Sequence, residues 1–224
     1  MNFFSQSRIT DEQAMWRVQM SADGEAFALL VQRWQRPIQS LCTRMLGDLH
    51  RGEDLTQEAF ARVFSRRKAY AATGKFSTFL WRVALNLCYD DLRRRDRRRE
   101  TAMIDEAGDA IEPAAIDAFS PDLALSQRET AERVRSALLR MSETYRSVLV
   151  LRHYEGLKFR EIAEVLEIPE GTVKSRMAEG LAQMACLLER DDTNTLLTDK
   201  GQRPAAAARP SDGTAANTNQ LLTL

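Results

Sequence analysis

The sequence predicts an all-α protein with two small helical domains joined by a flexible acidic linker, the second domain containing a helix-turn-helix. Three observations indicate this fold class. Apolar residues recur at three- and four-residue spacing along most of the chain, and Gly and Pro supply only 10 and 6 of its 224 residues. A stretch without periodicity, Glu100 to Pro121, interrupts the pattern near the middle. An apolar content of 44% suffices for two small cores.

The first domain, residues 1–99, is expected to begin with a helix near Thr10, because Thr10 to Gln13 fits a capping box. After Asp23 a long amphipathic helix is predicted, and Pro37 should bend it. Its apolar stripe consists of Phe27, Leu30, Val31, Trp34, Ile38, Leu41 and Met45. This stripe is long enough to form the centre of a core.

Two further helices complete this domain. Gly47 to Gly52 predicts a turn, and Glu53 to Ala69 predicts a helix that buries Leu55 and Phe60. The pattern breaks at Ala71 to Gly74, and a third long helix is expected from about Ser77. That helix runs into a segment with six arginines in seven positions, Arg93 to Arg99.

The rest of the chain divides into a linker, a second domain and a tail. Residues 100–125 are predicted to form a flexible acidic linker. The stretch from Ala102 to Gln127 contains six acidic and no basic residues. The second domain, residues 126–190, should hold four helices: Ser126 to Arg140, Glu143 to Tyr154, Phe159 to Leu166 and Thr172 to Leu188. The composition of residues 191–224 predicts a disordered tail.

Two patches carry chemistry suited to nucleic acid. Between Lys75 and Arg99 there are eight basic and three acidic residues, with aromatic side chains just ahead of the arginine run. Aromatic rings beside phosphate-neutralising charge suit single-stranded nucleic acid. The second patch, Lys158 to Met184, has the helix-turn-helix pattern that lays a helix in the major groove of a duplex.

Three motifs in this order resemble those of the extracytoplasmic-function group of bacterial RNA polymerase sigma factors. They are Glu53 to Phe60, Phe76 to Asn86 running into Asp90 to Arg94, and Gly171 to Arg176. The resemblance implies a sigma factor that binds RNA polymerase core and directs promoter recognition, strand opening and initiation. Residues 1–99 would be the region 2-like domain, which binds core and melts the promoter. Residues 126–190 would be the region 4-like domain.

The resemblance assigns roles position by position. Contacts with the polymerase core would come from Asp54, Gln57 and Glu58. Bases of the melted minus-ten element would be captured by Phe76, Ser77, Thr78, Trp81 and Asn86, and nearby phosphates held by Arg82, Arg93, Arg94 and Arg95. The upstream element would be read by Arg160, Thr172, Lys174, Ser175 and Arg176.

Each assignment has a structural alternative. The three polymerase contacts are equally typical of a solvated helix face, Trp81 fits a core position, and Phe79 fits the core better still and is not assigned to DNA. The arginine run is also consistent with a solvated surface, and the helix-turn-helix with a purely structural hairpin. The acidic linker is either a plain tether or a segment that enters a basic channel of the polymerase in place of RNA.

A competing function is an autonomous helix-turn-helix repressor or activator. Charge separates the two hypotheses, because sequence-independent DNA affinity comes mainly from phosphate neutralisation. Lys158 to Arg190 holds five basic and six acidic residues, so it has no basic surplus. The sequence therefore favours a protein that RNA polymerase recruits to promoter DNA.

Other classes have little support in the sequence. Cys42, Cys88 and Cys186 are far apart, and with only two histidines they predict neither a zinc site nor a disulfide framework. There is no phosphate-binding loop or nucleophile-base set, so we expect neither a cofactor nor an enzyme. No apolar run reaches the roughly 18 residues of a membrane span. We expect a cytoplasmic protein, with an anti-sigma factor as a further partner.

Overall fold

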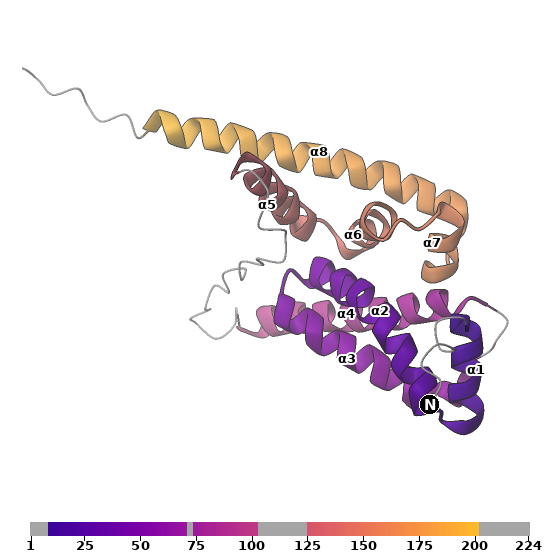
Figure 1. Cartoon of the computed structure of the whole chain (residues 1–224). Coiled ribbons are helices and arrows are strands. Elements are labelled where there is room, and N and C mark those ends of the chain that lie inside the picture. Colours follow the sequence, from indigo (N-terminus) through magenta and orange to yellow (C-terminus); the bar gives the residue numbers. More distant parts are fainter. Residues whose placement is uncertain (1–8, 71–73, 103–124, 202–224) are drawn as a thin grey trace, which may run out of the picture.

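The computed structural model describes residues 9–70, 74–102 and 125–201, and every regular element in these ranges is a helix. Figure 1 shows two layers, with α1 to α4 in one and α5 to α8 in the other. The first layer contains α1 (Asp11–Ser21), α2 (Gly24–Leu46), α3 (Leu49–Ser65), the short η2 (Arg67–Ala69) and α4 (Phe76–Ala102). The second contains α5 (Leu125–Arg140), α6 (Glu143–Leu149), η3 (Val150–Tyr154), α7 (Phe159–Leu166) and α8 (Glu170–Gly201).

Side-chain caps fix where the first helices begin. Thr10 and Gln13 form the predicted capping box of α1, each side chain bonding the backbone of the other. Asp23 accepts hydrogen bonds from the amides of Glu25 and Ala26, both at 3.0 Å. Asp48 accepts from the Arg51 amide at 3.0 Å, so α3 starts at Leu49. These bonds satisfy amides that helix starts leave unpaired.

The core of the first domain is built around α2. The predicted stripe supplies Leu30, Ile38, Leu41 and Met45, which are fully buried, and Pro37 lies inside a continuous α2. Against them pack apolar residues of the neighbouring helices: Met15, Val18, Leu55, Ala59, Val63, Phe76, Leu80 and Ala84. Amphipathic spacing alone therefore accounts for most of this core.

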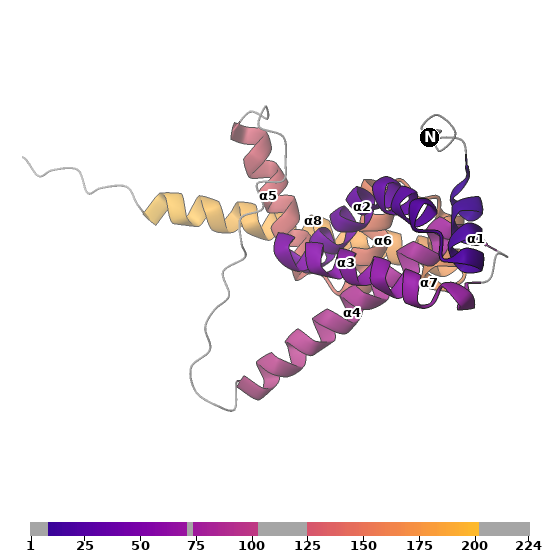
Figure 2. The same ribbon diagram turned by 60° about the horizontal axis from the view of Figure 1, so that its bottom comes forward.

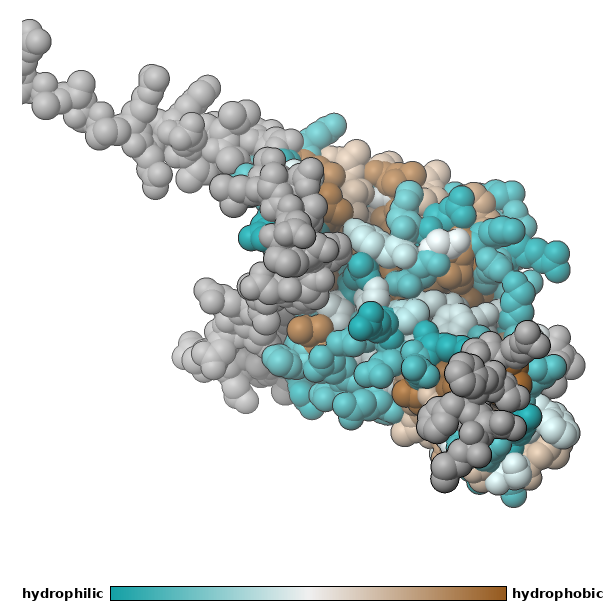
Figure 3. All heavy atoms as spheres, in the orientation of Figure 1, coloured by the Kyte–Doolittle hydropathy of each residue, from teal (hydrophilic) through white to brown (hydrophobic). Residues whose placement is uncertain are grey.

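The second domain packs α6, η3 and α7 against α8. Its interior contains Val148, Leu151, Ile162 and Val173, all with no exposed surface. Helix α6 continues into a π-helical turn, Val150–Tyr154. The outer side of α8 stays partly apolar, since Leu181 is exposed, and Figure 3 shows hydrophobic residues gathered along this helix.

The two domains are in contact through the end of α2. Arg146 of α6 is buried and donates to the carbonyl oxygens of Leu138, Leu139 and Met141 in its own domain and of Met45 in α2. Burial lowers the pKa of Arg146, and four carbonyl acceptors compensate for its desolvation. The last carbonyls of α2 are thus capped by a cation from the other domain.

Gly47 makes this contact possible. Its backbone has a left-handed φ of 73°, which ends α2, and a methyl group at this position would lie 2.5 Å from the Leu139 side chain of α5. A residue with a side chain would suffer both backbone strain and a clash. Arg135 also donates to the Gly47 carbonyl, at 3.2 Å.

Several predicted boundaries differ from the observed ones. Helix α3 begins four residues before the predicted Glu53, because Asp48 caps it. Helix α4 runs from Phe76 to Ala102, three residues into the predicted linker, and residues 103–124 lie outside the described ranges. Helix α8 extends to Gly201, into the segment predicted to be a disordered tail, whose residues 202–224 also lie outside them.

Within the described ranges, no helix is both long enough and apolar enough to cross a bilayer. In the same part of the chain, His, Cys, Asp and Glu side chains form no cluster suited to a metal ion. The three cysteines are free thiols, with Cys42 and Cys88 buried and Cys186 exposed.

Gly47→Ala should destabilise the chain by roughly 1–2 kcal/mol, the cost of a left-handed backbone in a residue with a side chain. Denaturant unfolding would measure the change. Gly24→Ala is the matched control, because a methyl group there would meet no atom within 4 Å. Its effect should stay within about 0.5 kcal/mol. Equal effects of the two substitutions would contradict the role given to Gly47.

Candidate nucleic-acid interface

Helix α4 has one apolar and one polar face. Phe76, Leu80, Ala84 and Leu87 are buried in the first domain, at the spacing of one helix face. The polar face holds Thr78, Arg82, Asn86 and Arg93, spaced by four, four and seven residues. Figure 2 shows the C-terminal part of α4 projecting away from the remaining helices. A long cationic edge is therefore held in place by a rigid, buried face.

The aromatic residues differ from the prediction. Phe76 is completely buried, with its ring edge-on to Tyr70 at 6.3 Å, so it is a core residue and does not offer a face for stacking. Trp81 is only 4% exposed and packs edge-on against Trp34 at 5.8 Å. Phe79, which the sequence interpretation left in the core, is partly buried and packs against the core, with its ring centroid 5.4 Å from that of Tyr70. The burial of Trp81 matches the core alternative that the sequence offered for it.

Three predicted base-contacting residues do come together. Ser77, Thr78 and Trp81 line one cavity of about 290 Å³ with Lys75, Trp34 and Pro37. The opposite wall of this cavity belongs to the second domain, through Glu155, Gly156, Leu157 and Glu161. Asn86 lies outside the cavity and is exposed.

The predicted phosphate-binding arginines fall into two groups. Arg93 and Arg94 are exposed. Arg95 is instead tied to Asp91 at 2.9 Å and lies 3.8 Å from Asp48. The nearly buried Asp91 carboxylate also accepts from Arg51 at 2.7 Å, and this hydrogen bond raises the pKa of Arg51. Arg95 therefore helps to fasten α4 to α3, a structural role that the sequence interpretation missed.

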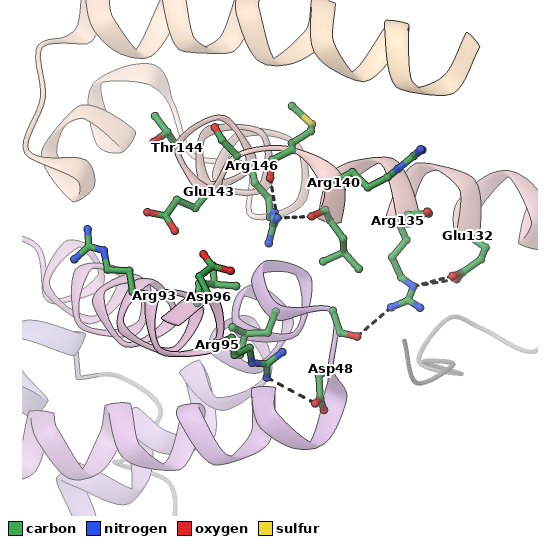
Figure 4. Close-up of a pocket in the computed structure, with 17 residues that line it drawn as sticks. Asp48, Arg93, Arg95, Asp96, Glu132, Arg135, Arg140, Glu143, Thr144 and Arg146 are labelled. Carbon is green, nitrogen blue, oxygen red and sulfur yellow. Dashed lines mark hydrogen bonds and ion pairs between the residues drawn. The ribbon is translucent and has the colours of Figure 1, made fainter. Parts of the chain in front are cut away.

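A larger cavity, of about 860 Å³, separates the arginine run from the second domain. Figure 4 shows both acidic and basic side chains around this cavity. One side carries Asp48, Arg93, Arg95 and Asp96, and the other carries Glu132, Arg135, Arg140, Glu143 and Arg146. Arg140 forms an ion pair with Asp191 of α8, and Arg135 one with Glu132 at 3.0 Å. Because most of these charges are already paired, the cavity has no strong preference for one sign of ligand.

The predicted helix-turn-helix consists of α7 and α8. Helix α7 spans the predicted residues, Phe159–Leu166, and Glu167 reverses the chain with a left-handed φ of 55°. Ile162 and Val173 are fully buried and hold the two helices together. Helix α8 begins at Glu170, since the amides of Thr172 and Val173 both donate to the Pro169 carbonyl.

The residues predicted to read the upstream element surround the start of α8. Lys174 and Ser175 are exposed, and Lys174 forms an ion pair with Glu170 at 2.8 Å. Thr172 and Arg176 are partly buried. Arg160 on α7 is exposed and lies 3.3 Å from Glu164. Exposed polar groups at a helix N-terminus are typical of contacts to base edges and phosphates.

The predicted polymerase contacts lie on α3, whose buried face includes Leu55 and Phe60. Asp54 and Gln57 are exposed. Glu58 is partly buried and pairs with Arg62 at 2.6 Å. These three residues therefore share an accessible polar side of α3.

Sequence reasoning missed the contacts that α4 and the residue before it make with α7 and the residue after it. Lys75 pairs with Glu161 at 2.8 Å, and Arg82 pairs with Glu167 at 2.7 Å. The partners are 86 and 85 residues apart in the chain. No local spacing or motif signals such pairs, because they depend on how the domains pack.

Comparison with known protein families gives two matches. The family model described as Sigma-70 region 2 matches residues 30–98, and that described as Sigma-70, region 4 matches residues 125–184. The first match covers most of α2 to α4, and the second covers α5 to the middle of α8.

Several curated proteins are similar over most of their length. An ECF RNA polymerase sigma factor, SigW of Bacillus subtilis, is 35% identical over 70% of this chain and 86% of its own. The RNA polymerase sigma-H factor of Pseudomonas aeruginosa is 34% identical over 75% and 88%. The ECF RNA polymerase sigma-E factor of Escherichia coli K12 is 31% identical over 76% and 90%.

Two solved structures share the fold. CnrH, in complex with the cytosolic domain of CnrY, matches with a TM-score of 0.59 and 21% identity, over 81% of this chain and 98% of that chain. The sigma factor RpoE of Bartonella quintana, in complex with the anti-sigma factor NepR, matches with a TM-score of 0.57 and 19% identity, over 74% and 98%.

Two neighbouring arginines should respond differently to substitution. Arg95→Ala should lower the free energy of unfolding by about 1–2 kcal/mol, because buried Asp91 loses one partner. Arg94→Ala should leave stability unchanged but reduce the slope of log Kobs against log salt for single-stranded DNA by about 0.7. Denaturant titration and fluorescence anisotropy would measure the two effects. If Arg95→Ala reduced the salt dependence and Arg94→Ala lowered the stability, Arg95 and not Arg94 would be the phosphate contact.

Proposed function

The chain belongs to the extracytoplasmic-function (ECF) sigma factors of bacterial RNA polymerase, and from this premise we propose how its helices divide the work of promoter binding. As a sigma factor it binds RNA polymerase core and directs promoter recognition and transcription initiation. The observation that carries the proposal is the polar face of α4, Thr78 to Arg93, in the same chain as an exposed recognition helix. One surface suits separated strands, and the other suits duplex DNA.

The polar face of α4 would hold the melted minus-ten element. Ser77, Thr78 and Asn86 supply hydroxyl and amide groups for unpaired bases, and Trp81 supplies a ring once its cavity is open to DNA. Arg82, Arg93 and Arg94 would bind phosphates alongside. Flipping a base costs a few kcal/mol, and such contacts stabilise the base after it leaves the stack. Phe76 and Arg95 would act indirectly, by keeping α4 in position.

The start of α8 would read the upstream element in duplex DNA. Lys174 and Ser175 are exposed there, with Thr172 and Arg176 beside them, and Arg160 of α7 would add a backbone contact. The N-terminus of a helix also attracts phosphate through its free amides. Because the net charge from Lys158 to Arg190 is not positive, this segment alone would bind DNA weakly.

The polymerase core would bind α3 and so hold the chain on the promoter. Asp54, Gln57 and Glu58 form the accessible polar side of that helix, and we assign them to core contacts. A protein that acts with RNA polymerase works in the cytoplasm and needs no catalytic group of its own. The solved relatives are bound to the cytosolic domain of CnrY and to the anti-sigma factor NepR. By analogy, we propose that an anti-sigma factor also holds this chain.

In vitro transcription with purified core tests the proposal. The chain should direct initiation on a matched promoter, and Arg82→Ala should slow strand opening roughly tenfold while core binding stays intact. Permanganate footprinting of unpaired thymines would follow opening. Arg36→Ala is the control, since Arg36 is exposed on α2, a helix that carries none of the residues assigned to DNA. Tight promoter binding by the chain alone, with no initiation when core is added, would instead support an autonomous regulator.

Arg176→Ala tests the recognition helix. If Arg176 reads a base edge, its loss should cost roughly 1–3 kcal/mol of discrimination against a promoter mutated at that base pair. Competition between the two promoters for the assembled holoenzyme would measure this difference. Equal weakening on both promoters would identify Arg176 as a phosphate contact, which is the result expected for Arg160→Ala.

A further inference from the structure

Helix α1 is hydrogen-bonded to the backbone that leads into α4. The side-chain amide of Gln19 donates to the Tyr70 carbonyl at 2.9 Å and to the Lys68 carbonyl at 3.3 Å. Two turns earlier on the same face of α1, the Glu12 carboxylate accepts from the Phe76 amide at 3.2 Å. One face of α1 therefore spans the distance between the end of η2 and the start of α4.

The Glu12 contact supplies a cap that α4 lacks in its own sequence. An N-cap side chain normally accepts from one of the first amides of its helix, but Lys75, which precedes Phe76, ends in a cation and has no acceptor. The Glu12 carboxylate provides that acceptor from another helix and places negative charge at the positive end of α4. Ser77 and Thr78 belong to the first turn of α4, and helix ends fray.

Tyr70 holds the same backbone from the other side. Its hydroxyl donates to the Gly74 carbonyl at 3.2 Å, and its ring packs against those of Phe76 and Phe79, with centroids 6.3 and 5.4 Å away. Burial and the charge of Glu12 raise the pKa of this hydroxyl, so it keeps its proton and remains a donor at neutral pH. The start of α4 is thus held by polar contacts from α1 and by aromatic packing from Tyr70.

We propose that Glu12 and Gln19 are positioning residues for the capture of unpaired bases, acting through the first turn of α4. This inference rests on the role proposed above for Ser77 and Thr78 in binding melted DNA. A hydroxyl that must meet a base as it leaves the duplex is effective only if its backbone is already in place, and a misplacement of about 1 Å can cost on the order of a hundredfold in rate. The family match to residues 30–98 does not include α1, so it assigns no role to these two side chains.

These two side chains act indirectly, because neither suits a contact with DNA. The Glu12 carboxylate would repel phosphate, and backbone carbonyls take both N–H groups of the Gln19 amide. Loss of the two contacts should therefore change the order of the first turn of α4 and leave the exposed cations further along, Arg93 and Arg94, unaffected.

The test uses the full-length chain assembled with core polymerase and follows strand opening with permanganate. Glu12→Ala with Gln19→Ala removes both contacts and should slow opening about tenfold, with core bound as tightly as by the wild type. Glu12→Gln keeps an acceptor for the Phe76 amide and should open at close to the wild-type rate. Arg17→Ala is the matched control, because Arg17 is exposed on the same helix, and it should behave as the wild type. If the double variant does not fold, Gln19→Ala alone serves the same comparison.

A double-mutant cycle separates positioning from general stability. In a background of Ser77→Ala with Thr78→Ala the groups to be positioned are gone, so the substitutions at Glu12 and Gln19 should slow opening no further. Equal slowing in both backgrounds, unchanged opening, or weaker binding to core would overturn the inference and leave the proposed function intact. Unchanged opening by Ser77→Ala with Thr78→Ala alone would instead remove the base-capture role of these residues, and the inference with it.

Discussion

The structure depends on one constraint, that α4 must bury one face in the first domain while its opposite face stays polar along its length. Leu80, Ala84 and Leu87 fix the buried face against α2 and α3. The buried Asp91 carboxylate, held between Arg51 and Arg95, fastens the same helix further along. A helix held this firmly presents Arg82, Asn86 and the following arginines as a rigid edge. Rigidity matters because a base that has left the duplex must find its contacts already in position.

Charge explains why the two domains act together. The chain has 32 basic and 32 acidic residues, distributed so that the first domain contains the arginine run, whereas the segment from Lys158 to Arg190 has no basic excess. The two charge patterns meet where Glu161 pairs with Lys75 and Glu167 pairs with Arg82. From the neutral overall charge we expect an initiation factor that binds DNA weakly alone and depends on the polymerase for electrostatic attraction. The contacts between the domains are not only polar, because buried apolar residues of both domains, such as Met45 and Leu151, belong to one cluster.

Local patterns predicted the fold well, and packing accounts for the errors. The capping box at Thr10, the stripe of α2 and the span of α7 follow from side-chain spacing, so the sequence was sufficient for them. Phe76, assigned to base stacking from the resemblance, is buried in the core, because neighbouring elements decide which side of the first turn of a helix is buried. Arg95 resembled its exposed neighbours in sequence and differs only in lying beside Asp91. Pairs such as Arg82 with Glu167 needed the tertiary structure.

The central claim is that the polar face of α4 holds the melted strand while its buried face keeps the helix in position, and site-directed DNA cleavage tests it most directly. Asn86→Cys, in a Cys186→Ser background, places one reactive thiol on this face, because Cys42 and Cys88 are buried. An iron chelate attached to this thiol would cut nearby DNA in the open complex with core polymerase. We expect cuts within the melted minus-ten strand. Cuts confined to duplex DNA outside the melted region would contradict the account.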